Sequence, residues 1–281
     1  MTNTGIIGLL LVIMNVAFSY KGFTNELFFE GYLFRVDKIL VNRDYKRLIS
    51  SGFLHVGWLH LIFNMIALLL FSSSVEALVG AGQFLVIYFA GLLGGNLLSL
   101  FIHRHHDDYS AVGASGAVAG VIFATIALFP GVGIGIPFIG ISMPGWLFGL
   151  LYVLYSIYGI RSRKDNIGHD AHLGGALIGM LTLVLLQPSA FIENYTTILI
   201  ILVPSLVFIY FIIRRPEILL IDNFFFKKHQ TFQSIDHRYN VAKKEKQDEI
   251  DCLLDKISKK GYSGLTKEEK EKLHQYSKTI N

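Results

Sequence analysis

Charged residues and cysteine are scarce in this sequence of 281 residues. Asp, Glu, Lys and Arg make up 16% of it, hydrophobic residues make up 52%, and the mean hydropathy is +0.50. Soluble domains rarely have this balance. The single cysteine, Cys252, excludes an internal disulfide framework and a metal cluster built on several thiolates. The scarcity of charge therefore indicates a protein that is solvated largely by a membrane.

Apolar segments of about the length that crosses a bilayer recur along the chain. Roughly 20 apolar residues span the hydrocarbon core, and shorter segments suffice where protein neighbours cover them. The first segment has no Lys or Arg before it and no clear small-residue cleavage site, which favours a span over a signal peptide. We expect an all-α fold, a polytopic membrane helical bundle. Seven segments are expected, at residues 5–20, 54–75, 83–102, 114–129, 145–160, 169–187 and 195–213.

The connecting segments differ in character. Residues 21–50 mix aromatic residues with Lys and Arg, which is typical of a segment at the membrane interface. Residues 130–144 are rich in Gly and Pro and are expected to form a turn-rich connection. We therefore divide the chain into a six-helix core at 1–190, one additional transmembrane helix at 191–214 and a polar helical C-terminal tail at 215–281.

Polar side chains on apolar segments are costly in a bilayer and usually have a functional or structural role. His60 and Asn64 are four residues apart on the second segment, so they share one helix face. Their N–H groups could converge on one point. Hydrogen bonding between helices explains the same pattern equally well.

Ser115 lies in Gly113-Ala114-Ser115-Gly116, directly before an apolar helix. At a helix start the unpaired backbone N–H groups and the macrodipole favour negative charge, as the oxyanion of an acyl-transfer reaction requires. Taken alone, a serine in this position is far more often an N-cap than a nucleophile.

His172 opens the sixth apolar segment, and Gly175 and Gly179 lie on its face of the helix. Small residues let two helices approach closely, and Gly116 with its neighbours offers a matching surface on the Ser115 helix. Ser115 and His172 could then meet within hydrogen-bond reach. A nucleophilic hydroxyl needs such a base, because its own pKa leaves it unreactive near neutrality.

Taken together, and in their order along the chain, the motifs around His60, Ser115 and His172 resemble the rhomboid family of intramembrane serine proteases over about residues 5–187. The resemblance implies a dyad without a third acid, in which Ser115 is the nucleophile and His172 the general base. It also implies that Asn64, His60 and the Ser115 backbone N–H bind the oxyanion. The motifs that carry it are His60-Leu-Ile-Phe-Asn64, Gly113-Ala114-Ser115-Gly116, and Ala171-His172 with Gly175 and Gly179.

Further residues match positions to which the family gives a structural role. The matches are His55, Arg47 and Glu76, and the glycines of the motifs are expected to support the dyad. Some family members have an aromatic residue four positions after the nucleophile, stacked on the catalytic histidine. That position is Ala119 here, so the resemblance does not say what packs against His172. The last apolar segment suits family members with six spans plus one.

The function implied is an endopeptidase that cleaves transmembrane protein substrates in or near their membrane segment. It implies no cofactor, no metal and no nucleic-acid partner, only membrane substrates and the lipid bilayer. We expect a multi-pass integral membrane protein of the bacterial plasma membrane. The positive-inside rule puts the face with the 21–50 segment in the cytoplasm, whereas the resemblance puts the catalytic face outside.

Two other functions compete with proteolysis. Rhomboid-like pseudoenzymes bind membrane proteins without cutting them, but they usually lack the serine or the histidine, and both are present here. Metal transport would draw on the histidines and aspartates of 103–108 and on His169 with His172, since imidazole and carboxylate suit a divalent transition metal. Asp170 is two residues from His172 and would point about 160° away on a helix, so we assign it no catalytic role.

Overall fold

Helices dominate the computed structural model, which describes residues 5–135, 142–162, 167–214, 256–257 and 266. The chain divides into two units, 1–226 and 227–281, and the labelled elements belong to the first. The predictions for the tail at 215–281 lie almost entirely outside the described residues. The helices are α1 (Ile6–Thr24), α2 (Glu26–Tyr32), α3 (Val36–Leu40), α4 (Arg47–Ser50), the 3-10 helix η1 (Ser51–Phe53), α5 (Trp58–Ile102), α6 (Ser115–Leu128), α7 (Gly145–Ser162), α8 (His169–Leu186) and α9 (Pro188–Arg214).

Within the residues that the structure describes, four strands form two short antiparallel pairs. One pair joins β1 (Phe34–Arg35) to β2 (Ser110–Ala111), and the other joins β3 (Gly133–Gly135) to β4 (Ser142–Pro144). The second pair occupies the stretch that was expected to be only a turn-rich connection. The first pair ties the segment after α2 to the segment that leads into α6.

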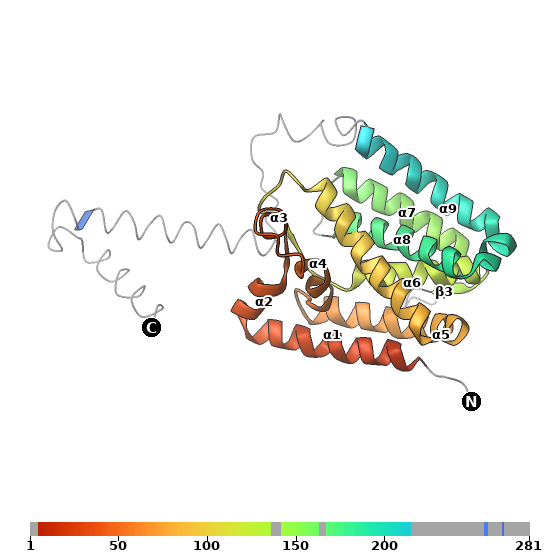
Figure 1. The fold of residues 1–281 in the computed structure, drawn as a ribbon, viewed down its shortest axis with the longest axis horizontal. Helices are drawn as coiled ribbons and strands as arrows, with labels where there is room; N and C mark the ends of the chain where they lie inside the picture. Colours follow the sequence, from red (N-terminus) through yellow and green to blue (C-terminus); the bar gives the residue numbers. More distant parts are fainter. Residues whose placement is uncertain (1–4, 136–141, 163–166, 215–255, 258–265, 267–281) are drawn as a thin grey trace. The chain divides into compact units, whose positions relative to one another are not determined.

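Helix α5 is long enough for two membrane crossings. It covers the expected segments 54–75 and 83–102 in one run, which begins at Trp58 rather than at 54. The backbone breaks at Gly80, where φ is 82° and ψ is 162°. Nothing lies within 4 Å of the place that a Cβ on Gly80 would take, so the positive φ, not packing, favours glycine there. In Figure 1 the two halves of α5 meet near its label.

The described helices have the composition of a membrane bundle. By length and composition, α1, α5, α8 and α9 can each cross a membrane, and α6 is a shorter apolar helix. Large apolar side chains are exposed along the outer helices, which suits a surface that faces lipid. The expected all-α membrane bundle is confirmed.

Helix α6 lies at the centre of the bundle, and every residue from Gly116 to Ala127 is buried. A Cβ on Gly120 would lie 3.1 Å from the carbonyl oxygen of Gly175 in α8 and 3.1 Å from Cα of Gly91 in α5. Small residues thus allow three backbones to approach closely. The contact predicted between the small-residue faces of the Ser115 and His172 helices is confirmed.

Residues 21–50 are more regularly folded than an interfacial loop would require. They contain α2, β1, α3 and α4, and bury a small apolar cluster around Phe34. Arg47 is only 7% exposed, and its Nη1 donates to the carbonyl oxygens of Glu30 at 2.9 Å and of Leu33 at 2.7 Å. A guanidinium buried in this way satisfies backbone acceptors of an irregular segment and so helps to fix its path.

Candidate active site

Three of the polar residues selected from the sequence belong to the first turns of their helices. His60 is the third residue of α5, Ser115 is the first of α6 and His172 is the fourth of α8. Contacts through Gly113 and Gly116 bring the three starts together.

Gly113 separates His60 from Ser115. A Cβ at this position would lie 2.8 Å from Cε1 of His60 and 3.6 Å from Oγ of Ser115, so both side chains border the same residue. The φ of Gly113 is 138°, a conformation that residues with a side chain rarely adopt. Its N–H donates to the carbonyl oxygen of Ser51 at 3.0 Å, which fixes the turn. Backbone geometry and space therefore both require glycine here.

His55 anchors the residue before the candidate nucleophile. It is fully buried, and its Nε2 accepts a hydrogen bond from the Ala114 N–H at 3.4 Å. Its Nδ1 lies 2.9 Å from Oγ of Ser19 in α1, and that hydroxyl donates to the Phe53 carbonyl oxygen at 3.0 Å. Nδ1 must then be the donor to Ser19, which defines a neutral tautomer. His55 therefore links α1 to the turn before α6.

The neutral state of His55 follows from its surroundings. His55 lies in the loop before α5, outside the spanning helices. Burial lowers the pKa of His55 to about 3, because the charged imidazolium loses its hydration, and a neighbouring histidine adds to the effect. The ring can therefore keep accepting from Ala114 throughout the physiological pH range.

The first turns of α6 and α8 touch beside Ser115 and His172. A Cβ on Gly116 would lie 3.2 Å from the carbonyl oxygen of Ala171, and a Cβ on Gly175 would overlap the Gly116 carbonyl. Gly116 follows Ser115 and Ala171 precedes His172, so this backbone contact lies one residue from each member of the predicted dyad. Both remain partly exposed, although Gly116 and Gly175 are buried.

An aromatic ring from α7 lies next to the imidazole of His172. The ring centroids of Tyr152 and His172 are 6.1 Å apart, with an angle of 28° between the planes. This separation is within the range of offset aromatic pairs. Tyr152 thus provides the aromatic ring beside His172 that some family members have at the position of Ala119. Sequence reasoning missed Tyr152, because no spacing in the chain relates a position on α7 to the start of α8.

Asn64 and His60 lie one turn apart on α5. The Asn64 Nδ2 donates to the His60 carbonyl oxygen at 2.9 Å within the helix, and the amide carries a second N–H. The rings of His60 and His55 pack edge to face, with centroids 4.9 Å apart. The two side chains predicted as oxyanion donors therefore lie one turn apart on α5, and His60 is the one that borders Gly113.

Glu76 of α5 caps the N-terminus of α1, the end of that helix away from Ser19. Its carboxylate accepts hydrogen bonds from the backbone N–H groups of Ile7 and Gly8, each at 3.1 Å. The N-cap residue of α1 is Gly5, which has no side chain that could accept hydrogen bonds from these N–H groups. Glu76 takes over that function and places a negative charge at the positive end of the helix macrodipole.

The arrangement gives the metal hypothesis no support. Within the described part of the chain, no group of three or more His, Cys, Asp or Glu residues is placed to hold a metal ion. His103 instead stacks on Tyr109 and pairs with Asp170.

Comparison with known proteins agrees with the fold and with the order of the motifs. The family model described as the Rhomboid domain matches residues 42–189, just over half of the chain. A second model, for a family of unknown function called DUF6576, matches residues 233–279.

Several curated proteins are similar to this chain. RHOMBOID-like protein 12, mitochondrial, of Arabidopsis thaliana is 28% identical over 63% of this chain and 56% of its own length. Rhomboid protein 1, mitochondrial, of Saccharomyces cerevisiae is 31% identical over 51% of this chain and 43% of its own. Rhomboid protease GluP of Bacillus subtilis is 25% identical over 70% of this chain and 37% of its own. The chain thus spans between 37% and 56% of the length of these relatives.

The helical bundle, its apolar spans and the matching domain agree with one another. The protein is a multi-pass membrane protein, and it belongs to the rhomboid family.

Proposed function

We propose that this protein is an intramembrane serine endopeptidase. It cleaves transmembrane protein substrates in or near their membrane segment, with Ser115 as nucleophile and His172 as general base. The observation that carries the proposal is the contact between the first turns of α6 and α8, where Gly116 lies against Ala171. A family relative that is named as a protease, GluP of Bacillus subtilis, supports the same chemistry.

The proposed reaction uses groups that the chain itself supplies. His172 takes the proton of the Ser115 hydroxyl as its oxygen attacks the scissile carbonyl carbon, and the resulting oxyanion is bound at the N-terminus of α6. The backbone N–H of Ser115, the amide of Asn64 and the ring of His60 are the proposed donors. His172 then gives its proton to the leaving amine. Water hydrolyses the acyl-enzyme by the same steps in the second half of the reaction.

A rhomboid-like protein that binds membrane proteins without cutting them is the alternative. The mitochondrial relatives are named as rhomboid or rhomboid-like proteins, and those names state no activity. The presence of Ser115 beside a packed, glycine-lined helix contact favours the protease. A bacterial plasma membrane stays a prediction, because the relatives include mitochondrial proteins as well as bacterial ones.

The test is cleavage of a model transmembrane substrate by the full chain reconstituted in liposomes. Wild type is expected to produce two fragments, and Ser115→Ala is expected to produce none while it expresses and folds normally. Ser110→Ala is the matched control, because Ser110 lies in β2 just before the site and has no proposed role in the chemistry. Equal cleavage by wild type and Ser115→Ala would contradict the proposal.

A further inference from the structure

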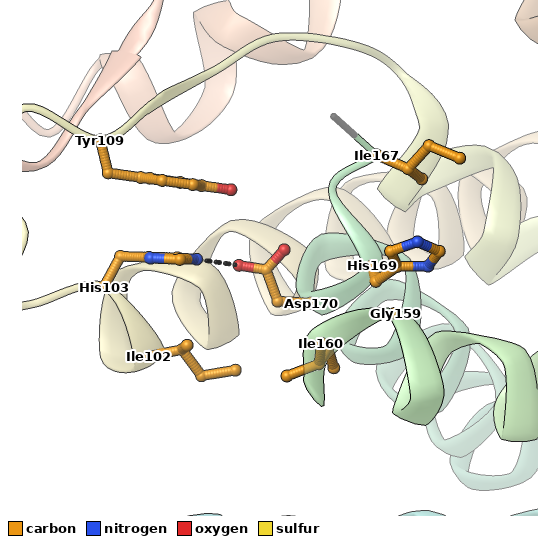
Figure 2. Close-up of a pocket in the computed structure, with 8 residues that line it drawn as sticks. All are labelled: Ile102, His103, Tyr109, Gly159, Ile160, Ile167, His169 and Asp170. Atoms are coloured by element: carbon orange, nitrogen blue, oxygen red, sulfur yellow. Dashed lines mark ion pairs between the residues drawn. The ribbon is translucent and has the colours of Figure 1, made fainter. Parts of the chain in front are cut away.

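A polar cluster apart from the proposed dyad joins the end of α5 to the start of α8. Figure 2 shows His103 and Asp170 facing each other, with Nε2 of His103 at 3.1 Å from Oδ2 of Asp170. Their side chains are only 15% and 6% exposed. The Tyr109 ring stacks on the imidazole of His103, with centroids 3.5 Å apart and 6° between the planes. The cluster borders a pocket of ≈ 180 Å³.

Two members of this cluster, Tyr109 and Asp170, are close in sequence to the proposed site, and the third, His103, directly follows α5. His103 ends α5, and its N–H donates to the Ser99 carbonyl oxygen at 2.9 Å. Tyr109 directly precedes β2, which leads into the turn before Ser115. Asp170 is the second residue of α8, two positions before His172. The cluster therefore joins the segment that leads to the nucleophile to the helix that carries the base.

Burial makes the pairing between His103 and Asp170 important. A carboxylate out of water needs a charged or hydrogen-bonding partner, and loss of one member of a buried pair leaves the other uncompensated. The first turn of α8 also favours a negative charge at Asp170 through the helix macrodipole. Because Asp170 and His172 are two residues apart, they project from nearly opposite sides of the helix. Asp170 can thus act on the dyad only by holding α8.

We propose that Asp170 and His103 are a positioning pair, which fixes the first turn of α8 against the 103–111 segment and so sets the spacing between His172 and Ser115. This inference rests on the proposed function. A displacement of about 1 Å between reacting groups can lower a rate by roughly a hundredfold, so a contact outside the dyad can control the chemical step.

The test compares kcat and KM of full-length variants in liposomes, at a temperature where each variant is folded. Asp170→Ala is expected to lower kcat by about tenfold or more while KM changes by less than about twofold, because the substrate contacts are untouched. Asp170→Asn keeps a hydrogen-bond acceptor and is expected to recover most of the rate. His103→Gln is expected to lower kcat, and its combination with Asp170→Ala is expected to cost no more than Asp170→Ala alone.

Glu76→Gln is the matched control, since Glu76 of α5 is another buried carboxylate that caps the start of a helix, but that helix is α1, and the capped end is the one away from Ser19 and His55. It is expected to lower the thermal midpoint while the kcat of the folded protein stays unchanged. An equal loss of kcat in Glu76→Gln and Asp170→Ala would overturn the positioning role, and so would a full wild-type rate in Asp170→Ala. Neither result would affect the proposed function. A wild type without activity would overturn the proposed function and the inference with it.

If Asp170→Ala does not fold, Asp170→Ser and His103→Gln carry the same test, because serine removes the carboxylate but leaves a small polar side chain. Their combined effect on kcat is then compared with the product of the single effects. Independent effects that multiply would overturn the pair, because residues that act as one unit are not additive.

Discussion

Gly175 of α8 lies so close to Gly116 of α6 that a methyl group on Gly175 would overlap the Gly116 carbonyl. The contact is between two backbones, so no change of side-chain rotamer can make room. It lies one residue from Ser115 and within one turn of His172, and for this reason the packing of the bundle and the geometry of the proposed site depend on the same two residues.

Gly175→Ala is expected to destabilise the protein by about 1–3 kcal/mol, the usual cost of adding atoms to a well-packed contact. Thermal unfolding in detergent, followed by circular dichroism, measures the effect. Gly82→Ala is the matched control, because Gly82 also lies in a helix but nothing is within 4 Å of the place of its Cβ. The control should be as stable as wild type or more so, since alanine favours helix over glycine. Equal behaviour of the two variants would contradict the close contact.

The stability of the protein is expected to fall as the pH falls below about 6.5. The unfolded chain binds a proton at His55 near pH 6.5, whereas the folded chain, with its pKa at about 3, does not. The stabilisation from neutral His55 is therefore complete above pH 6.5 and is lost progressively toward pH 3, by up to about 1.4 kcal/mol for each pH unit.

Comparison with His55→Gln isolates this contribution from that of the other histidines. The variant should be less stable at pH 8, because it loses the hydrogen bond from Ala114, and its stability should fall less steeply between pH 6.5 and 5. Thermal midpoints measured across this range give both slopes. Identical slopes in wild type and variant would show that His55 does not titrate as expected.

Tyr152 is expected to hold the ring of His172 in place. Tyr152→Ala should lower kcat by about tenfold, because the imidazole gains freedom to leave the geometry that proton transfer requires. Tyr152→Phe keeps the ring and should retain most of the rate. Steady-state kinetics on a transmembrane substrate distinguish the two variants, and a Tyr152→Ala variant with the rate of wild type would exclude this role.

The sequence predicted the helical bundle well because its signals are strong and local. Apolar segments of bilayer length define the helices, and the glycines that follow Ser115 and His172 predict which faces meet. The beginning of α5 was placed a few residues too early, at 54 instead of Trp58. The sequence did not predict that the break between the two spans of α5 falls at Gly80, because nothing distinguishes a glycine with positive φ from the other glycines of the chain.

Contacts between distant segments that are not marked by a small-residue pattern could not be predicted. Tyr152 and His172 are on different helices, and His103 and Asp170 are separated by α6 and α7. Their pairing depends on how the helices rotate about their axes, which the three-dimensional packing sets. The regular structure within residues 21–50 was missed for a similar reason, because β1 exists only through its pairing with β2.

The most direct measurement is labelling of the purified full-length protein by a fluorophosphonate probe, in wild type, Ser115→Ala and His172→Ala. Such a probe reacts covalently with a serine that an adjacent base activates. Labelling of wild type that is lost in both variants is the predicted result. Absence of labelling in a folded wild type, or labelling that persists in Ser115→Ala, would contradict a Ser115–His172 dyad.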